Sequence, residues 1–320
     1  LPGAGGNVVL SVGGDGILMV DTGATQATTK LLAAIPQTYA PPRPPAMGSS
    51  ASQWADTWQI SHSVAAPLIR TIINTSIDAD HIGGNEAVKK SSLFHPIGFQ
   101  GDEEAAEVIL AHENVQKHMI EANAAPGSLP THTYLQGRFR LHRYFNGEGV
   151  ELIHVPNAHT DGDTVVWFRG SNVIAAGDVY NTDIYPVIDI DKGGSVEGLI
   201  DALVRIADLC YPEYMSQGGT LVIPGHGRLS DIADVGYYRD MVVVVRDRIK
   251  AMIDKKMTLQ QVKAAKPTMD YDPLYGRKRG SQCGAEARDV AVEVLGQVQP
   301  RGNRHHGGNR VARNSGVLNL

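Results

Sequence analysis

The sequence predicts an α+β fold in which two β-sheets pack face to face with helices on the outside, an αββα four-layer sandwich. Strand-like runs and helical segments alternate in both halves of the chain, and this order is typical of two sheets covered by helices. The chain has 320 residues, of which 42% are hydrophobic, so it can bury a sizeable core. We expect a single domain over residues 1–298, with a Pro-rich loop region at 38–63 and a flexible tail at 299–320.

The N-terminal half is expected to begin with a hairpin, because two β-rich runs flank a glycine-rich turn at 13–16. A later β-branched, apolar run has the composition of a buried strand. In chain order, the expected elements are strands at 8–12 and 17–20, a helix at 24–35, a strand at 67–75, a helix from about 83, a short strand near 92–97 and a charged helix over about 102–123.

The C-terminal half repeats the alternation of strands and helices. Ser195 is expected to begin an amphipathic helix, and Thr258 with Gln261 forms a capping-box pattern before the last helix. The expected elements are strands at 150–156, 164–169 and 172–176, a helix from 195 to about 210, a strand at 219–224, a long helix at 230–254 and a helix after 258.

Charge and hydropathy exclude several classes of function. The net charge of -5 and pI of about 6.2 provide no basic surface for nucleic acid. No apolar run reaches the roughly 18 to 20 residues that a membrane span needs, so we expect a soluble protein. The chain begins at Leu1 without an initiator Met, and we expect a processed or truncated product, bacterial periplasmic, secreted or cytoplasmic. Cys210 and Cys283 allow one disulfide or two buried thiols, and a homo-oligomer is open.

Four clusters of carboxylates and imidazoles follow strand-like runs, and together they predict a metal site. Their candidate ligands are Asp78, Asp80, His81, His159, Asp178 and His226. Metals that activate water bind imidazole nitrogen and carboxylate oxygen and keep open positions for water and substrate. Taken singly, Asp78 or Asp80 could cap the helix near Gly83, and His226 could occupy a turn for backbone reasons. Taken together, the six are better explained as ligands.

Adjacent residues on a strand point to opposite faces, so Asp80 and His81 converge only if the chain turns sharply into the next helix. His154 lies inside an apolar run and is expected to be a core histidine. The hydroxyls of Tyr180 and Tyr185 are candidates for substrate binding, with packing as the alternative. The pair His305-His306 belongs to the expected solvated tail.

The motifs resemble those of the metallo-β-lactamase superfamily over nearly the whole chain, from Gly5 to about Tyr275. The segments that carry the resemblance are Val20-Asp21-Thr22-Gly23, Asp80-His81-Ile82-Gly83-Gly84-Asn85, His159-Thr160-Asp161-Gly162-Asp163, Gly177-Asp178 and Pro224-Gly225-His226-Gly227. The resemblance implies the αββα sandwich and up to two metals at one edge between the sheets. It also implies that Asp80, His81 and His226 bind one metal, that His159 binds the other, and that Asp178 bridges them.

The chain departs from the family pattern H-x-H-x-D-H, because Ser76 and Asp78 stand where the two leading histidines are expected. Asp78 remains a candidate oxygen ligand, and Ser76 is a poor one. With two divalent ions, two carboxylates and a hydroxide the charge is +1, and the Asp78 carboxylate brings it to 0. A more oxygen-rich site shifts the preference from Zn toward Mn, Fe, Mg or Ca. Zn is the first expectation, Mn or Fe the alternative, with one or two ions per chain.

The expected function is metal-dependent hydrolysis of a small-molecule carbonyl ester, lactone or thioester. A metal-bound hydroxide would attack the carbonyl, and Asp80, the predicted catalytic residue, would orient the nucleophile or shuttle its proton. An aspartate at position 178 resembles the glyoxalase II and lactonase branches, so β-lactam hydrolysis is expected only as a weak activity. The alternative is a degenerate member that binds without catalysis.

Overall fold

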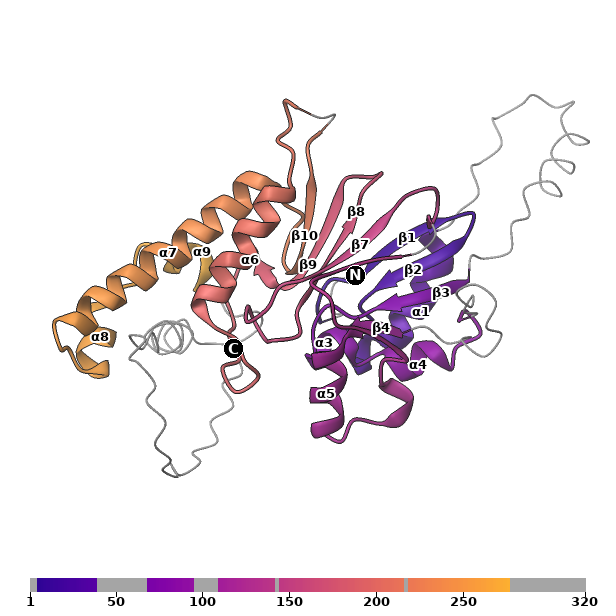
Figure 1. Ribbon diagram of the computed structural model, residues 1–320, viewed down its shortest axis with the longest axis horizontal. Coiled ribbons are helices and arrows are strands. Elements are labelled where there is room, and N and C mark those ends of the chain that lie inside the picture. Colours follow the sequence, from indigo (N-terminus) through magenta and orange to yellow (C-terminus); the bar gives the residue numbers. More distant parts are fainter. Residues whose placement is uncertain (1–4, 39–67, 95–108, 142–143, 216–217, 277–320) are drawn as a thin grey trace, which may run out of the picture. The chain divides into compact units, whose positions relative to one another are not determined.

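The computed structural model describes residues 5–38, 68–94, 109–141, 144–215 and 218–276. The chain has two compact units (Figure 1). Unit 1 comprises Leu1–His154 and Thr164–Ala175, and unit 2 comprises Val155–Asp163 and Ala176–Leu320. A single domain over 1–298 stays a prediction. Residues 39–63 of the expected Pro-rich loop and the whole expected tail lie outside the described residues.

The first sheet lies in unit 1 and has the strand order β1-β2-β3-β4-β5. Its strands are β1 (Val9–Gly13), β2 (Gly16–Val20), β3 (Ile69–Ile73), β4 (Ile109–His112) and β5 (His132–Tyr134). β1 and β2 form the predicted antiparallel hairpin, whereas β2 to β5 pair in parallel. Parallel strands end at the same edge of a sheet. The residues that follow β2 and β3 therefore leave the sheet at one edge.

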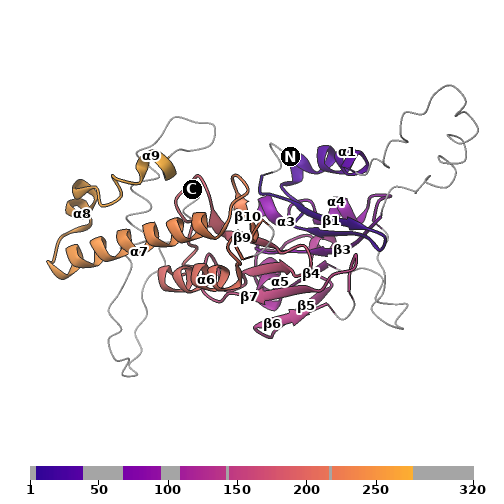
Figure 2. The ribbon, with the colours of Figure 1, turned by 90° about the horizontal axis from the view of Figure 1, so that it is seen from above.

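Unit 1 also holds β6 (Arg138–Arg140), β7 (Val150–His154), β8 (Thr164–Phe168) and the start of β9 (Val173–Asn181), all antiparallel. These strands pack against the first sheet through one apolar cluster, which confirms the predicted face-to-face packing (Figure 2). The cluster contains Leu18, Val20, Ile73, Leu110 and Tyr134 from the first sheet and Leu152, Val166, Phe168 and Ala175 from the second.

Helices cover the other face of the first sheet. The 3-10 turn η1 (Thr25–Ala27) leads into α1 (Thr28–Thr38), and α4 spans Asn85–Lys89. Leu31, Ile35 and Val88 from these helices pack against the apolar residues of β2, β3 and β4. A smaller cluster joins α5 (Glu113–Glu121) to the end of β4, and the 3-10 turn η2 (Pro126–Ser128) follows α5.

Unit 2 contains the rest of β9 and β10 (Leu221–His226), with α6 (Val196–Leu209) and α7 (Ile232–Asp254) side by side. The short helices α8 (Leu259–Ala265) and α9 (Asp272–Tyr275) follow. The Ser195 side chain accepts from Gly198 N, and the Thr258–Gln261 capping box is present. Both predicted helix starts are therefore confirmed, as is the α+β class with two sheets and several helices.

The helix predicted over 102–123 is wrong at residues 109–112, which form the buried parallel strand β4. All four of its residues are buried, so the strand has no alternation of apolar and polar side chains that would distinguish it from a buried helix. Residues 102–108 and 95–97 lie outside the described residues. Of the expected strand near 92–97, the structure shows one bridge between Phe94 and Ile69. The helix expected from about 83 begins earlier, at Ala79, and is interrupted before α4.

None of the helices in the described part of the chain combines the length and the apolar composition that crossing a bilayer requires. Cys210 is a buried thiol at the end of α6. Its predicted pairing choice stays open, because Cys283 lies outside the described ranges.

Candidate metal centre

Asp80 and His81 lie on the short helix α3 (Ala79–Ile82), which follows β3 in unit 1, with Asp78 as its N-cap residue. Adjacent side chains on a helix are only about 100° apart, whereas on a strand they oppose each other. The ligand atoms that Asp80 and His81 offer lie within 4.8 Å of each other. The sharp turn that the sequence requires is thus made by helix α3.

A hydrogen bond fixes the tautomer of the His81 ring. His81 is fully buried, and its Nδ1 lies 2.6 Å from Oδ2 of Asp21. Because an ionised carboxylate can only accept, the proton lies on Nδ1 and is donated to Asp21. In the neutral ring the lone pair is then on Nε2, the atom with which such a histidine binds a metal.

Asp21 is a functional candidate to which the sequence reasoning gave no role. It is buried at the end of β2 and has a left-handed backbone, with φ of 61°. Besides His81, its carboxylate accepts from the Thr75 backbone N at 2.8 Å and from Thr75 Oγ1 at 2.6 Å. These three contacts fix the position of the carboxylate beside the His81 ring. A charged residue directly after a fully buried apolar strand was the available signal.

Two glycines leave space beside this half of the candidate site. A Cβ on Gly6 would lie 2.8 Å from both Nε2 and Cε1 of His81, and a Cβ on Gly5 would lie 2.6 Å from Cβ of Asp80. Real Cβ atoms do not approach other atoms so closely. Only glycine therefore avoids a clash with the His81 ring and with Asp80 at these two positions.

Ser76 and Asp78 lie between β3 and α3. Ser76 is fully buried, and its Oγ accepts from the Asp78 backbone N at 3.3 Å. Asp78 is half-buried and its side chain makes no capping hydrogen bond to α3. The capping explanation for Asp78 is therefore wrong at this helix, and its role as a ligand stays a prediction.

Unit 2 brings His159, Asp178 and His226 together. Nε2 of His226 lies 3.3 Å from Oδ1 of Asp178, and His159 offers a ligand atom within 4.8 Å of one on Asp178. His159 and Asp178 are buried, and the His226 side chain is 17% exposed. A Cβ on Gly225 would lie 2.5 Å from Asp178 Oδ1, so glycine is required where β10 passes this carboxylate. Two imidazoles around one carboxylate are a suitable partial ligand set for a divalent metal.

The loop that carries His159 is held from two directions. Nδ1 of His159 lies 3.0 Å from the Val187 carbonyl, to which it donates, so the lone pair is again on Nε2. Asp163 accepts from Thr160 N and Thr160 Oγ1, each at 2.7 Å. Burial raises the pKa of Asp163 to about 6, although His159 and Thr160 oppose that rise.

The turn at His226 is held by the residues that end β9. The His226 backbone N donates to Asn181 Oδ1 at 2.9 Å, and Thr182 N donates to the His226 carbonyl at 3.2 Å. Two residues after His226, Arg228 N donates to Thr182 Oγ1 at 2.9 Å. Gly227 has φ of 105°, which other residues rarely adopt. We call Asn181 and Thr182 the His226 clamp, because they fix the backbone on both sides of this side chain.

The two tyrosines predicted to contact substrate are both buried in unit 2. Tyr185 donates to the Thr268 carbonyl and to Asp272 Oδ1, and Tyr180 packs edge-to-face on Tyr238. Their role with substrate stays a prediction.

His154 was expected to be a core histidine. It is half-buried in unit 1 and stacks on His112 with 3.7 Å between ring centroids. The ring packs on another side chain but is only partly buried, so the expected core position is not shown.

The structure thus brings the predicted ligands together as two sets, Asp80 with His81 in unit 1 and His159 with Asp178 and His226 in unit 2. In both sets a hydrogen bond fixes a histidine tautomer with Nε2 as the candidate ligand atom.

The chain matches a known protein family. The sequence pattern of the metallo-beta-lactamase superfamily matches residues 1–214. The chain belongs to the metallo-beta-lactamase superfamily. It is therefore a metallo-hydrolase by family, and members of this superfamily bind divalent metals.

Solved structures with a similar fold include other proteins of this superfamily. DIM-1 metallo-beta-lactamase is 15% identical, with a TM-score of 0.49, over 74% of this chain and 86% of that one. A metallo-beta-lactamase from Pontibacter korlensis is 14% identical, with a TM-score of 0.47, over 73% of this chain and 85% of that one. A double mutant of the sec-alkyl sulfatase PisA1 is 12% identical, with a TM-score of 0.58, over 92% of this chain and 47% of that one. No curated protein matches the chain significantly.

Proposed function

We propose that this chain hydrolyses a carbonyl ester, lactone or thioester with the help of one or two divalent metals. The proposed ligands are Asp78, Asp80, His81, His159, Asp178 and His226. The observation that carries the proposal is the hydrogen bond from His81 Nδ1 to Asp21, which leaves Nε2 as the ligand atom. Membership of the superfamily supports the same interpretation.

The residues fit a divalent metal in three respects. Imidazole nitrogens and carboxylate oxygens make up the ligand set, as in hydrolytic metal sites. His81 and His159 both present Nε2, because each Nδ1 donates to a fixed acceptor. The glycine at position 6 keeps the Nε2 side of His81 clear, since a Cβ there would lie 2.8 Å from this atom.

Zinc is the proposed metal, with manganese or iron as the alternative. Imidazole ligands suit zinc and iron, whereas each added carboxylate favours harder ions. Asp78 decides the balance, because it replaces an imidazole of the family pattern with an oxygen ligand. When bound, the metal would lower the pKa of water and polarise the substrate carbonyl.

The side chains have separate tasks in this proposal. Asp80, which is half-buried on α3, would take up the proton that the attacking water gives up, at one of its carboxylate oxygens. Asp21 keeps the His81 ring in one orientation, and the His226 clamp does the same for the backbone of His226. Asp178 stands at a position where true β-lactamases usually carry Cys or Ser, so β-lactam hydrolysis is proposed only as a weak activity.

A non-catalytic binding member of the fold is the second candidate. Two observations favour it. Ser76 and Asp78 replace two histidines of the family pattern, and the Ser76 hydroxyl already accepts a hydrogen bond from the Asp78 backbone N. In such a protein the remaining ligands would hold a metal, or nothing, without turnover.

Metal analysis combined with hydrolysis assays separates the two candidates. The purified protein is stripped with a chelator, reloaded with Zn, Mn or Fe, and assayed on an ester, a lactone, a thioester and a β-lactam. We expect stoichiometric metal and activity that returns with the metal. The double variant Asp80→Ala, His226→Ala should lose both, whereas Asp201→Asn, an exposed carboxylate on α6, should keep both. Activity that survives the double variant would contradict the proposal.

A further inference from the structure

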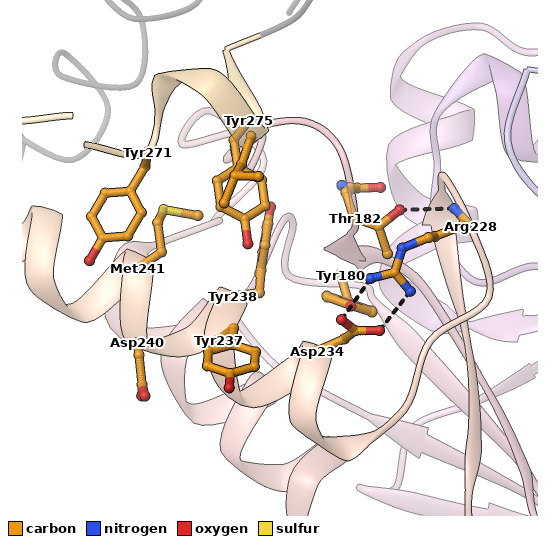
Figure 3. Close-up of a pocket in the computed structure, with 12 residues that line it drawn as sticks. Tyr180, Thr182, Arg228, Asp234, Tyr237, Tyr238, Asp240, Met241, Tyr271 and Tyr275 are labelled. Atoms are coloured by element: carbon orange, nitrogen blue, oxygen red, sulfur yellow. Dashed lines mark hydrogen bonds and ion pairs between the residues drawn. The ribbon is translucent and has the colours of Figure 1, made fainter. Parts of the chain in front are cut away.

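Unit 2 contains a pocket of about 390 Å³, and five of its twelve lining residues are tyrosines (Figure 3). This volume is at the lower end of the roughly 300–1,000 Å³ typical of small-molecule sites, so the pocket has room for one ring-bearing group. Its lining residues include Tyr180, Asn181, Thr182, Arg228, Tyr237 and Tyr238.

The inner wall of the pocket consists of buried tyrosine rings that pack on one another. Tyr180 and Tyr238 are each 1% exposed and pack edge-to-face, with 5.3 Å between ring centroids, and Tyr238 packs in the same way on Tyr275 at 5.4 Å. Burial raises the pKa of Tyr238 well above its usual value, so this phenol is neutral near pH 7. The Tyr238 hydroxyl donates to the Ile184 carbonyl. These buried rings back the pocket, and the aromatic surface that a ligand can touch comes chiefly from Tyr237, which is exposed, and from Tyr271, which is half-buried.

The charged groups that line the pocket are paired with protein partners. Arg228 makes two hydrogen bonds to Asp234, each at 2.7 Å, and Asp240 accepts from Arg239. A bidentate pair of this kind holds the guanidinium in the plane of the carboxylate. An anionic ligand would have to compete with Asp234 for Arg228, so the pocket favours an uncharged ligand.

The pocket borders the turn that carries His226. Asn181 and Thr182, the His226 clamp, line the pocket and bond to the His226 backbone, and Arg228 lies two residues after His226. Tyr180 likewise lies two residues after Asp178, about 7 Å along the strand. A group bound in the pocket would therefore lie close to two of the proposed metal ligands.

We propose that this pocket binds the aromatic group of the substrate, so that the preferred substrate is an ester or thioester with one uncharged aromatic ring. This inference rests on the proposed hydrolase function. Tyr237 is the residue that tests it, because it lines the pocket from α7 and is 72% exposed, so its removal leaves the buried wall intact.

The experiment compares benzyl acetate, cyclohexylmethyl acetate and 4-carboxybenzyl acetate with the metal-loaded full chain. These esters have similar leaving groups and differ in aromaticity or charge. We expect benzyl acetate to have the highest kcat/KM. Tyr237→Ala should lower it by about 2- to 12-fold, the range of one aromatic contact, and should lower the value for cyclohexylmethyl acetate less. The matched control Tyr214→Ala removes an 87% exposed tyrosine that does not line the pocket, and should change none of them.

Binding of benzyl alcohol, followed by NMR, supplies a readout without turnover, and Tyr237→Ala should weaken it by the same factor. If the wild type hydrolyses benzyl acetate but Tyr237→Ala changes neither kcat/KM nor benzyl alcohol binding, the inference is overturned and the proposed function stands. A preference for the cyclohexylmethyl or carboxybenzyl ester overturns it too. If only a lactone is hydrolysed, the inference is overturned and the proposed function stands. If the metal-loaded protein hydrolyses no ester, lactone or thioester, the proposed function itself fails.

Discussion

The replacement Asp21→Asn tests how the proposed metal ligand His81 is prepared for binding. Asparagine has the shape of aspartate and tolerates the left-handed backbone at this position, with φ of 61°. The Thr75 backbone N–H lies 2.8 Å from Oδ1 and cannot rotate, so the amide oxygen must take that side. The amide nitrogen then faces His81 Nδ1, which has to accept instead of donate, and the ring proton moves to Nε2.

A proton on Nε2 blocks the atom that would bind the metal. Loss of such an orienting partner typically costs 10- to 100-fold in metal affinity, or about 1.4 to 2.8 kcal/mol. We expect a loss of this size, with kcat falling at limiting metal and recovering in part at excess metal. Thr75 Oγ1 can turn to accept from the new amide, so the fold should be retained.

Competition with a metallochromic chelator measures the affinity, and nitrogen-15 NMR of the histidine rings in the metal-free protein reports which nitrogen carries the proton. Asp201→Asn makes the same chemical change on the exposed face of α6 and should alter neither. If Asp21→Asn binds metal within twofold of the wild type, or if Nδ1 still carries the proton, the reasoning about the tautomer is refuted.

Three further outcomes follow from the structure. Gly6→Ala places a Cβ 2.8 Å from His81 Nε2, so metal affinity should fall by at least tenfold while circular dichroism stays unchanged; unaltered chelator competition would contradict this. Asn181→Ala removes the side-chain oxygen that accepts from the His226 backbone N–H. A bound metal should then dissociate roughly tenfold faster in stopped-flow chelation, and an unchanged rate would contradict the role of the His226 clamp. Burial raises the pKa of Cys210 from 9.0 to about 12. The neutral thiol therefore stabilises the fold fully below pH 9 and loses that contribution as the pH rises toward 12. In a Cys283→Ser background, its reaction with a disulfide reagent at pH 8 should be at least about 30-fold slower in the folded than in the unfolded chain, and equal rates would contradict burial.

The sequence predicted those parts of the fold whose secondary structure is determined by residues close together in the chain. The hairpin of β1 and β2 has a glycine turn between two apolar runs, and the start of α8 has both members of a capping box. Residues 109–112 lacked such a signal, because a strand buried on both faces has the same apolar run as a buried helix. Only its pairing with β3 and β5 makes it a strand.

The sequence shows the residue types of the candidate ligands, but it does not show the hydrogen bonds that orient them. Imidazoles and carboxylates after strand-like runs are visible in the sequence, whereas their hydrogen-bond partners are not. Asp21 is 60 positions from His81, and His159 bonds to the Val187 carbonyl, which any residue could supply. Contacts of that separation depend on strand pairing and loop closure, which leave no local pattern.

The replacement of two family histidines by Ser76 and Asp78 has unequal consequences for these positions. Ser76 is fully buried, and its hydroxyl accepts a hydrogen bond from the Asp78 backbone N. It therefore stabilises the turn that leads into α3. Asp78 is half-buried at the helix N-cap without capping it through its side chain, so helix formation does not account for the carboxylate. If Asp78 binds a metal, its negative carboxylate replaces a neutral imidazole, and the net charge of the metal centre is lower by one. A centre of lower charge is a weaker Lewis acid, and it suits activated esters and thioesters better than the less reactive amide bond of peptides.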